Sequence, residues 1–479
     1  MSKFNQTNSI KTVNRSGNQA YAMTDKAKLV TQVLTSFFNE AKFYGDNSEE
    51  LVRTLQAVIK TDPAFVASLA VVARREFHMR SVAHVLTGYL AHEPEGKPYV
   101  RHTVKGVALR GDDLTEIMSF YLATFGKPIP NSLKKGIADV LVTLDEYTLA
   151  KYKGSGKSLK MKDLLCLCRP SPKDEAQSAM WKRCLEDRLA VPVTWETQLS
   201  AKGNKAATWE ALIDSGKVGY MALLRNLRNI LQAKPRNIDR VWRTIADPEA
   251  VRRSQQLPFR FLSAYKEIAQ MADSRALEAL EDAVRASVAN MPRWDGTTVI
   301  AVDVSGSMGS RISAKSEVRC FEIAVMLGLM ANQICDNSIF YIFNDKIHKV
   351  AVSRKTGILY AATHFDYGGF TNMYLPFEKM ITDKVEADRI IILSDNECNA
   401  TNTWGNRKPV QVLADEYREK SGRDIWVHAV DLEGYGTQQF HGSKTNIIAG
   451  WSERVLDFIR LAEQGEGSLA AAVEAYEWE

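Results

Sequence analysis

The sequence predicts a multidomain protein in which an all-α region of repeated helix pairs is followed by a doubly wound α/β domain. Three observations support this fold class. Apolar residues recur at helical spacing from about residue 24 to 292. Continuous apolar runs alternate with helical segments after MPRWDGTT at 291–298. The charge also changes sign, since residues 1–295 hold 44 Lys and Arg against 32 Asp and Glu, whereas residues 296–479 hold 18 against 25.

The helical region contains eight amphipathic segments joined by short connectors. Several segments begin at a capping residue, such as Asp25, Asn47 or Asp62. Consecutive helical hairpins without strands between them predict a solenoid of helix pairs over residues 24–294, and an irregular helical bundle is the alternative. The eight segments are 25–38, 47–60, 62–77, 80–93, 112–125, 131–144, 217–231 and 274–291.

The second region has the pattern of a parallel sheet covered by helices on both faces. Strands that are buried on both faces require continuous rather than alternating apolarity. We therefore expect an α/β domain over 295–465, with an N-terminal arm at 1–23 and a C-terminal tail at 466–479. The predicted strands are 297–305, 338–345, 388–395 and 424–432, and the predicted helices are 313–334, 372–383 and 410–420.

The composition bears on compartment and partners. The six cysteines are too few for a disulfide framework, and Cys166-Leu-Cys168 lacks the second pair of ligands that zinc needs. The N-terminus has no apolar core like that of a signal peptide, and no apolar run reaches the roughly 18 residues of a membrane span. We expect a cytoplasmic protein with no membrane partner, whose basic half binds a polyanion.

Oxygen-bearing side chains gather where the predicted strands end. Asp303, Ser305 and Ser307 follow the first strand, Thr371 lies in the loop DYGGFTNM, and Asp395 ends a later strand. The carboxyl ends of parallel strands form the binding edge of such a sheet. Because hard cations prefer oxygen ligands, these five residues predict a site for Mg²⁺ or another divalent cation such as Mn²⁺.

Two other interpretations of this cluster remain. In a phosphoryl-transferring hydrolase Asp303 would be the nucleophile, but such chemistry normally needs a second acid two residues later, where this chain has Ser305. A serine-rich turn without metal is the other. We expect no enzymatic activity.

The five residues resemble the metal-ion-dependent adhesion site (MIDAS) of von Willebrand factor A domains. That pattern is DxSxS, then a Thr in a Gly-Gly loop, then an Asp that ends a later strand, and the resemblance spans residues 296–465. It implies that the three hydroxyls contact the metal directly and that the acids act mostly through water. A partner's carboxylate would complete the coordination.

The helical half resembles the TROVE module, the RNA-binding module of the Ro ribonucleoprotein family. The resemblance rests on residues 134–172 and 220–231, on the early words AYAMTDKAKL, AKFYGD and VVARREF, and on the order of the two domains. It implies a monomeric ring of HEAT-like helix pairs closed by the A domain. It also implies binding of small noncoding Y-like RNA outside the ring and of single-stranded ends of misfolded RNA inside it. The expected role is RNA quality control or processing in a ribonucleoprotein, with an exoribonuclease as partner.

Candidate RNA contacts lie in a lysine-rich segment and on one later helix. Matching the words KYK and DLLxL places a family lysine at Lys151, an arginine at or beside Lys157 and a histidine at Arg169. Lysines around the flexible GSG sequence are able to reach phosphates. The full set is Lys134, Lys135, Lys151, Lys153, Lys157, Arg169, Arg225 and Arg228, with Arg74 and Arg75 as further candidates.

A different class of function is a protein-interaction scaffold. In that case the helices would bind protein, and the metal-bearing A domain would capture a partner carboxylate. A protein-binding solenoid need not be basic, whereas residues 1–295 carry a net charge of +12. The charge therefore favours RNA.

Overall fold

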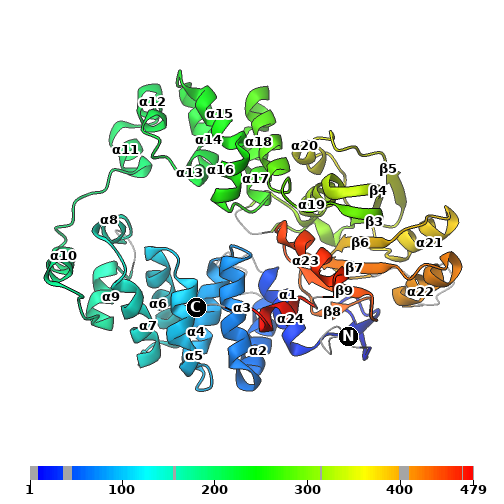
Figure 1. Cartoon of the computed structure of the whole chain (residues 1–479), viewed down its shortest axis with the longest axis horizontal. Coiled ribbons are helices and arrows are strands. Elements are labelled where there is room, and N and C mark those ends of the chain that lie inside the picture. Colours follow the sequence, from blue (N-terminus) through cyan, green and yellow to red (C-terminus); the bar gives the residue numbers. More distant parts are fainter. Residues whose placement is uncertain are drawn as a thin grey trace. The chain divides into compact units, whose positions relative to one another are not determined.

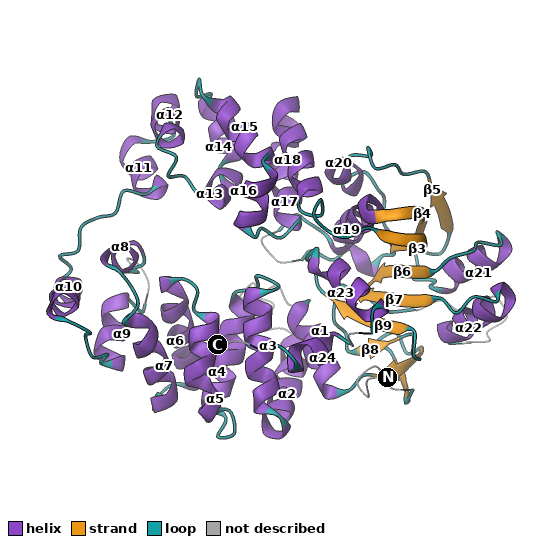
Figure 2. Cartoon of the chain, in the orientation of Figure 1, coloured by secondary structure: helices purple, strands orange, loops and turns teal. Residues whose placement is uncertain are grey.

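The computed structural model describes residues 9–35, 46–154, 158–312, 316–398, 409–465 and 468–477 (Figure 1). The chain divides into two compact units. The first unit is Met1–Asn47 with Lys202–Ala472, and the second is Ser48–Ala201 with Val473–Glu479. Figure 2 shows that the long strands lie in the C-terminal part and that helices make up most of the rest. Within the described ranges, no helix is long and apolar enough to cross a membrane.

A six-stranded sheet forms the centre of the A domain, in the order β5-β4-β3-β6-β7-β9. All pairings are parallel except that of β5, which runs antiparallel to β4 at one edge. The four predicted strands are confirmed, whereas β5 and β9 were not predicted because each is only four or five residues long. The strands are β3 (Trp294–Asp303), β4 (Cys335–Phe343), β5 (Ile347–Val350), β6 (Arg389–Ser394), β7 (Trp426–Asp431) and β9 (Thr445–Ala449).

Helices cover both faces of this sheet, as the continuous apolar strands require. On one face Val299 of β3 shares a buried core with Phe377 and Tyr417. On the other face Gly328 approaches the sheet so closely that a Cβ atom there would lie 3.1 Å from Phe340. The helices of the domain are α19 (Cys320–Ile334), α20 (Ile358–Ala362), α21 (Tyr374–Thr382), α22 (Val410–Ser421) and α23 (Arg454–Glu463).

The N-terminal arm expected at 1–23 contains two short strands. Strands β1 (Lys11–Val13) and β2 (Gln19–Ala22) form a hairpin that pairs with β8 (Thr437–Gln438). The side-chain amides of Asn14 and Asn18 each donate to the Cys398 carbonyl at 2.9 Å. These bonds join the hairpin and the following helix α1 (Asp25–Leu34) to the A domain in the first unit.

The second unit is a series of packed helices. Helix α3 contacts α4 and α5, α4 contacts α6, and α5 contacts α7, so each helix packs on its near neighbours in sequence. This pattern is that of a helical repeat. The helices are α2 (Asp46–Thr61), α3 (Pro63–Arg75), α4 (Ser81–His92), α5 (Lys97–Val107), α6 (Gly111–Phe125), α7 (Asn131–Leu141), α8 (Glu146–Lys151), α9 (Met161–Cys168), α10 (Glu175–Leu185) and α11 (Trp195–Lys202).

The later helices belong to the first unit and pack on the A domain. Lys266 donates to both carboxylate oxygens of Glu322 at 2.6 and 2.8 Å, so the expected boundary near residue 294 is not a gap between separate bodies. The helices are α12 (Ala206–Asp214), α13 (Tyr220–Arg225), α14 (Leu227–Ala233), α15 (Ile238–Ala246), α16 (Pro248–Ser254), α17 (Phe259–Ile268) and α18 (Ser274–Ala286), and a short helix α24 (Leu469–Glu474) follows the A domain.

The single helix predicted over 217–231 is two helices, α13 and α14. Asn226 separates them with φ −107° and ψ 11°, and its side-chain amide donates to the Ala222 carbonyl at 2.8 Å. Asparagine side chains compete with the backbone in this way and so interrupt helices. The break changes the directions of Arg225 and Arg228.

Candidate functional site

The structure brings the five predicted metal ligands together at the carboxyl edge of the sheet. The Ser305 amide donates to Asp303 Oδ1 at 2.8 Å. The Thr371 hydroxyl donates to Ser305 Oγ at 2.9 Å, and Ser307 Oγ lies 3.2 Å from Ser305 Oγ. Ser307 also hydrogen-bonds to Asp395, which follows β6. Three segments distant in sequence thus present hydroxyl and carboxylate oxygens to one another.

Backbone hydrogen bonds hold the loop of Thr371 against the loop of Ser305. The Gly306 amide donates to the Gly369 carbonyl at 3.0 Å, and the Gly368 amide donates to the Val304 carbonyl at 2.8 Å. Gly369 has φ +77°, and a Cβ atom there would lie 2.3 Å from Asp345 Oδ1. Glycine is favoured at this position because the left-handed backbone strains any residue with a Cβ atom, and such an atom would also require the exposed Asp345 carboxylate to move.

Two carboxylates of the cluster are fully buried beside each other. Burial raises the pKa of Asp303 to about 6. Burial and the charge of Asp303 raise the pKa of Asp395 well above its usual range. Asp395 Oδ2 has no hydrogen-bond partner in the part of the chain that the structure describes. A divalent cation would stabilise both charged carboxylates, so this all-oxygen set fits a hard metal ion.

One acid near the cluster was missed. Asp431 ends β7, is fully buried, and accepts hydrogen bonds from the amides of Glu433 (2.9 Å) and Gly434 (2.7 Å). Burial raises its pKa to about 7, and its charge contributes to the raised pKa of Asp395. The signal was available, because Asp431 ends an apolar run just as Asp303 and Asp395 do.

In the second unit Lys151 lies among aromatic side chains. Its Nζ is 5.7 Å from the Tyr147 ring centroid and 5.4 Å from that of Tyr152. The Arg110 guanidinium lies 5.4 Å from the same Tyr152 ring. Tyr147 is 51% exposed. We call Arg110, Tyr147, Lys151 and Tyr152 the Tyr152 cluster. Of this cluster, sequence reasoning selected only Lys151. Arg110 is distant in sequence, and the two tyrosines are near Lys151 but were not selected.

The other lysine-rich candidates have different surroundings. Lys153 is exposed and Lys157 lies outside the described residues. Arg169 is exposed and ends α9 in a left-handed conformation, with φ 47°. On α7, Lys135 is exposed, whereas Lys134 is half-buried and its charge partly offsets the effect of burial on the pKa of Cys168, which is raised to about 12.

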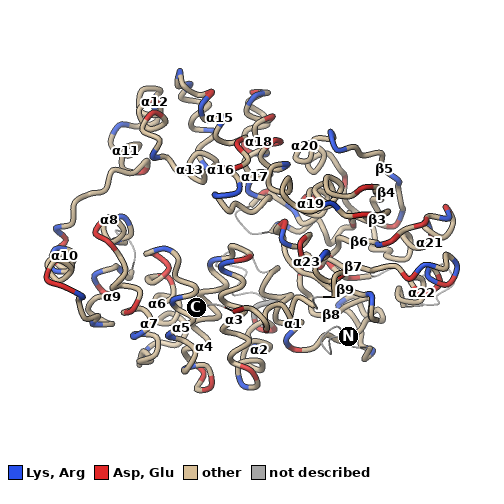
Figure 3. Tube along the Cα trace, in the orientation of Figure 1, with Lys and Arg blue, Asp and Glu red and all other residues tan. Residues whose placement is uncertain are grey.

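The further candidates Arg74 and Arg75 both form hydrogen bonds within the second unit. Arg74 is buried and donates to Asp113 Oδ2 at 3.2 Å, and His84 Nε2 lies 3.1 Å from Oδ1 of the same carboxylate. Arg75 donates to the Gly106 carbonyl at 3.0 Å. Figure 3 shows Lys and Arg interleaved with Asp and Glu along many helices, so basic side chains there have acidic neighbours.

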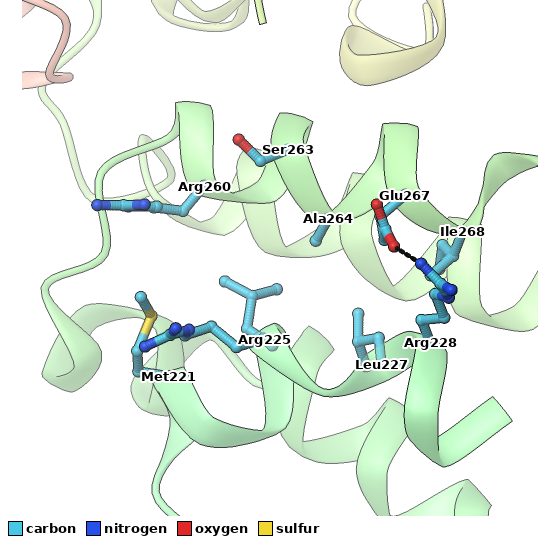
Figure 4. Close-up of a pocket in the computed structure, with 10 residues that line it drawn as sticks. Met221, Arg225, Leu227, Arg228, Arg260, Ser263, Ala264, Glu267 and Ile268 are labelled. Carbon is cyan, nitrogen blue, oxygen red and sulfur yellow. Dashed lines mark hydrogen bonds and ion pairs between the residues drawn. The ribbon is translucent and has the colours of Figure 1, made fainter. Parts of the chain in front are cut away.

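Arg225 and Arg228 do not share one helix face. Arg228 is on α14 and pairs with Glu267 at 2.6 Å. Arg225 ends α13, and its side chain extends to the same end of a cavity as that of Arg260 on α17, a residue that sequence reasoning did not select (Figure 4).

Comparisons with known proteins cover both halves of the chain. A model of the TROVE domain matches residues 16–188 and 185–310, and a model of the Ro60 vWA domain matches residues 297–453. The crystal structure of the Deinococcus radiodurans RO (RSR) protein is similar with a TM-score of 0.61 and 17% identity, over 92% of this chain and 100% of that chain. At this identity the likeness shows the fold.

Curated relatives match parts of the sequence. RNA-binding protein RO60 of Caenorhabditis elegans is 26% identical over 250 residues, 48% of this chain and 38% of the relative. Telomerase protein component 1 of Mus musculus is 24% identical over 303 residues, 46% of this chain and 12% of the relative. The chain thus spans less than half the length of these relatives. Because the domain model covers more than half of the sequence, this chain belongs to the TROVE-domain family and carries a Ro60-type von Willebrand factor A domain.

Proposed function

We propose that this chain is a non-catalytic RNA-binding protein of the Ro type. The observation that carries the proposal is the Tyr152 cluster, which presents the exposed Lys151 and a half-exposed tyrosine beside Arg110, itself paired with Asp112, within the segment matched by the TROVE model. Lysine and arginine supply salt-dependent contacts with phosphates, and exposed aromatic rings stack on unpaired bases. The relatives named RNA-binding protein RO60 support the same class of ligand.

The finer parts of the proposal follow from the resemblance to Ro proteins. A small structured Y-like RNA would contact Lys151, Lys153 and Arg169, and misfolded or decaying RNA would enter by its single-stranded end. The chain would act as a cytoplasmic monomer in noncoding RNA quality control. An exoribonuclease partner would supply the cleavage.

The A domain would bind Mg²⁺ or Mn²⁺ at the five-residue cluster. Ser305, Ser307 and Thr371 would hold the ion through their hydroxyls, and Asp303 and Asp395 would act mostly through water. When bound, the ion would supply a Lewis-acidic position for a carboxylate of a partner. Replacing Asp303 and Ser305 together by alanine should abolish Mn²⁺ uptake while RNA binding persists, and unchanged uptake would refute the site.

The RNA interface is tested by charge reversal. Lys151→Glu with Lys153→Glu should weaken binding of a small structured RNA and reduce the slope of log affinity against log salt by roughly 0.7 to 0.9 per lost phosphate contact. The matched control reverses Arg53 and Lys60, two exposed cations on α2. If both double variants behave like the unmodified chain, the interface is wrongly assigned.

A protein-interaction scaffold is the second candidate function. Phe370 is 68% exposed and directly precedes Thr371 of the cluster. An exposed aromatic ring beside a metal position suits a protein partner that offers a carboxylate. Metal-dependent capture of a protein, lost in Phe370→Ala and insensitive to Lys151→Glu, would favour this function.

A further inference from the structure

A small cavity lies between helices α13, α14 and α17 of the first unit. Its volume is about 190 Å³. Arg225 and Arg260 lie at one end and Arg228 with Glu267 at the other, and the wall between them is mostly apolar, with Ser263 as its polar residue (Figure 4). Leu224 and Leu227 come from the segment on either side of the Asn226 break, and Ala264 and Ile268 come from α17. The break therefore gives this cavity its shape.

Two arginines lie at one end of the cavity. Figure 4 shows the guanidinium groups of Arg225 and Arg260 at the same end as Met221. Arg260 stacks with its guanidinium carbon 4.8 Å from the Phe259 ring centroid. Among the described residues, Arg225 forms no ion pair with a carboxylate. Desolvation and the charge of Arg225 lower the pKa of Arg260, as expected for two cations that repel each other.

At the other end of the cavity the charged side chains form an ion pair. Arg228 and Glu267 form an ion pair there at 2.6 Å. Glu267, the one carboxylate among the described residues that line the cavity, is therefore already paired with a different arginine. An anion that entered the cavity would be attracted to the end where Arg225 and Arg260 lie.

The size and charge of the cavity restrict its ligand. A volume of about 190 Å³ is below the roughly 300–1,000 Å³ of pockets for drug-sized molecules, so one phosphate with part of its nucleoside fits better than a whole cofactor. A guanidinium group often binds a phosphate through two parallel N–H···O hydrogen bonds. A terminal phosphate monoester carries about −1.5 to −2 charges at neutral pH. A phosphodiester carries one charge, so two arginines at one end of the cavity favour the monoester.

We propose that this cavity binds the terminal phosphate monoester of a single-stranded RNA end through Arg225 and Arg260, with the apolar wall against the attached nucleoside. The inference rests on the proposed RNA-binding function and adds to it a preference for phosphorylated ends. Arg260 is then a binding residue, and Arg228 is not.

The test measures binding of the full chain to short oligouridines that end in a 5′-phosphate, a 3′-phosphate or hydroxyls only. One of the phosphorylated ends should bind about tenfold more tightly than the hydroxyl ends, a factor typical of one charge-assisted hydrogen bond. Arg225→Gln and Arg260→Gln should each remove this preference. Arg236→Gln should retain it, because that side chain is 95% exposed and loses the same charge outside the cavity. Thermal unfolding of all three variants checks that the fold is intact.

The outcomes separate this inference from the function on which it rests. If RNA binds but all three ends bind equally, the inference is overturned and the RNA-binding function stands. If no RNA binds, the RNA-binding function fails, and uridine monophosphate is compared with uridine. Tighter binding of the monophosphate that depends on Arg260 then supports the cavity as a phosphate site, and equal binding overturns it.

Discussion

Replacing Gly369 by alanine should weaken metal binding without unfolding the A domain. The residue has φ +77°, which costs roughly 1–2 kcal/mol for a residue with a Cβ atom. The new Cβ atom would also lie 2.3 Å from Asp345 Oδ1, so this exposed carboxylate must move aside. Relaxation of the backbone strain would lengthen the 3.0 Å hydrogen bond from the Gly306 amide to the Gly369 carbonyl, worth about 1 kcal/mol.

Together these effects cost about 2–3 kcal/mol in the conformation that holds Thr371 beside Ser305. If the metal binds only that conformation, its dissociation constant should rise about 30- to 150-fold. Titration with Mn²⁺, followed by electron paramagnetic resonance, measures the change. Gly219→Ala is the control, because a Cβ atom there meets nothing within 4 Å. An unchanged Mn²⁺ affinity in Gly369→Ala would refute the view that the paired loops set the site geometry.

Two further predictions concern stability. Asp113→Asn should lower the free energy of unfolding of the second unit by about 3–5 kcal/mol, because buried Arg74 loses its countercharge. Denaturant titration should show a much smaller loss for Asp139→Asn, whose partner Arg101 is exposed, and equal losses would contradict this. Burial raises the pKa of Glu463, but hydrogen bonds, led by that from His428, outweigh it and lower the pKa to about 2. Because the pKa is lower in the folded state, ionised Glu463 stabilises the fold above pH 4.5, the unfolded pKa, and this stabilisation is lost as the pH falls toward 2. Glu463→Gln should therefore make stability less dependent on pH between about 4.5 and 2, as measured by thermal unfolding at each pH.

Much of the A domain could be predicted because its strands are continuous apolar runs that end at acids. This pattern identified Asp303 and Asp395. The other three residues of the site, Ser305, Ser307 and Thr371, were identified from their loops near the strand ends. Asp431 obeys the same pattern and was overlooked. Strands β5 and β9 could not be found in this way, since β5 is partly exposed along its whole length and β9 is only five residues long.

The basic side chains were less predictable. Arg74 looks like a surface cation in the sequence, but in the structure it is buried and pairs with Asp113 on another helix. Arg225 and Arg228 look like neighbours on one helix until the side chain of Asn226 breaks that helix. In each case the deciding contact comes from packing or from a local competition for hydrogen bonds that periodicity does not record.

The sequence by itself determined the order of a helical half and an α/β half, and the oxygen cluster at the strand ends, because strand polarity brings the ends of parallel strands to one edge. Only the tertiary structure decided which cations are paired and which converge. Asp113 engages Arg74 and Glu267 engages Arg228, whereas Arg260 meets Arg225 at one end of a cavity. The physical reason is that a charged side chain pairs with the opposite charge nearest to it in space, and helix packing decides which side chain that is.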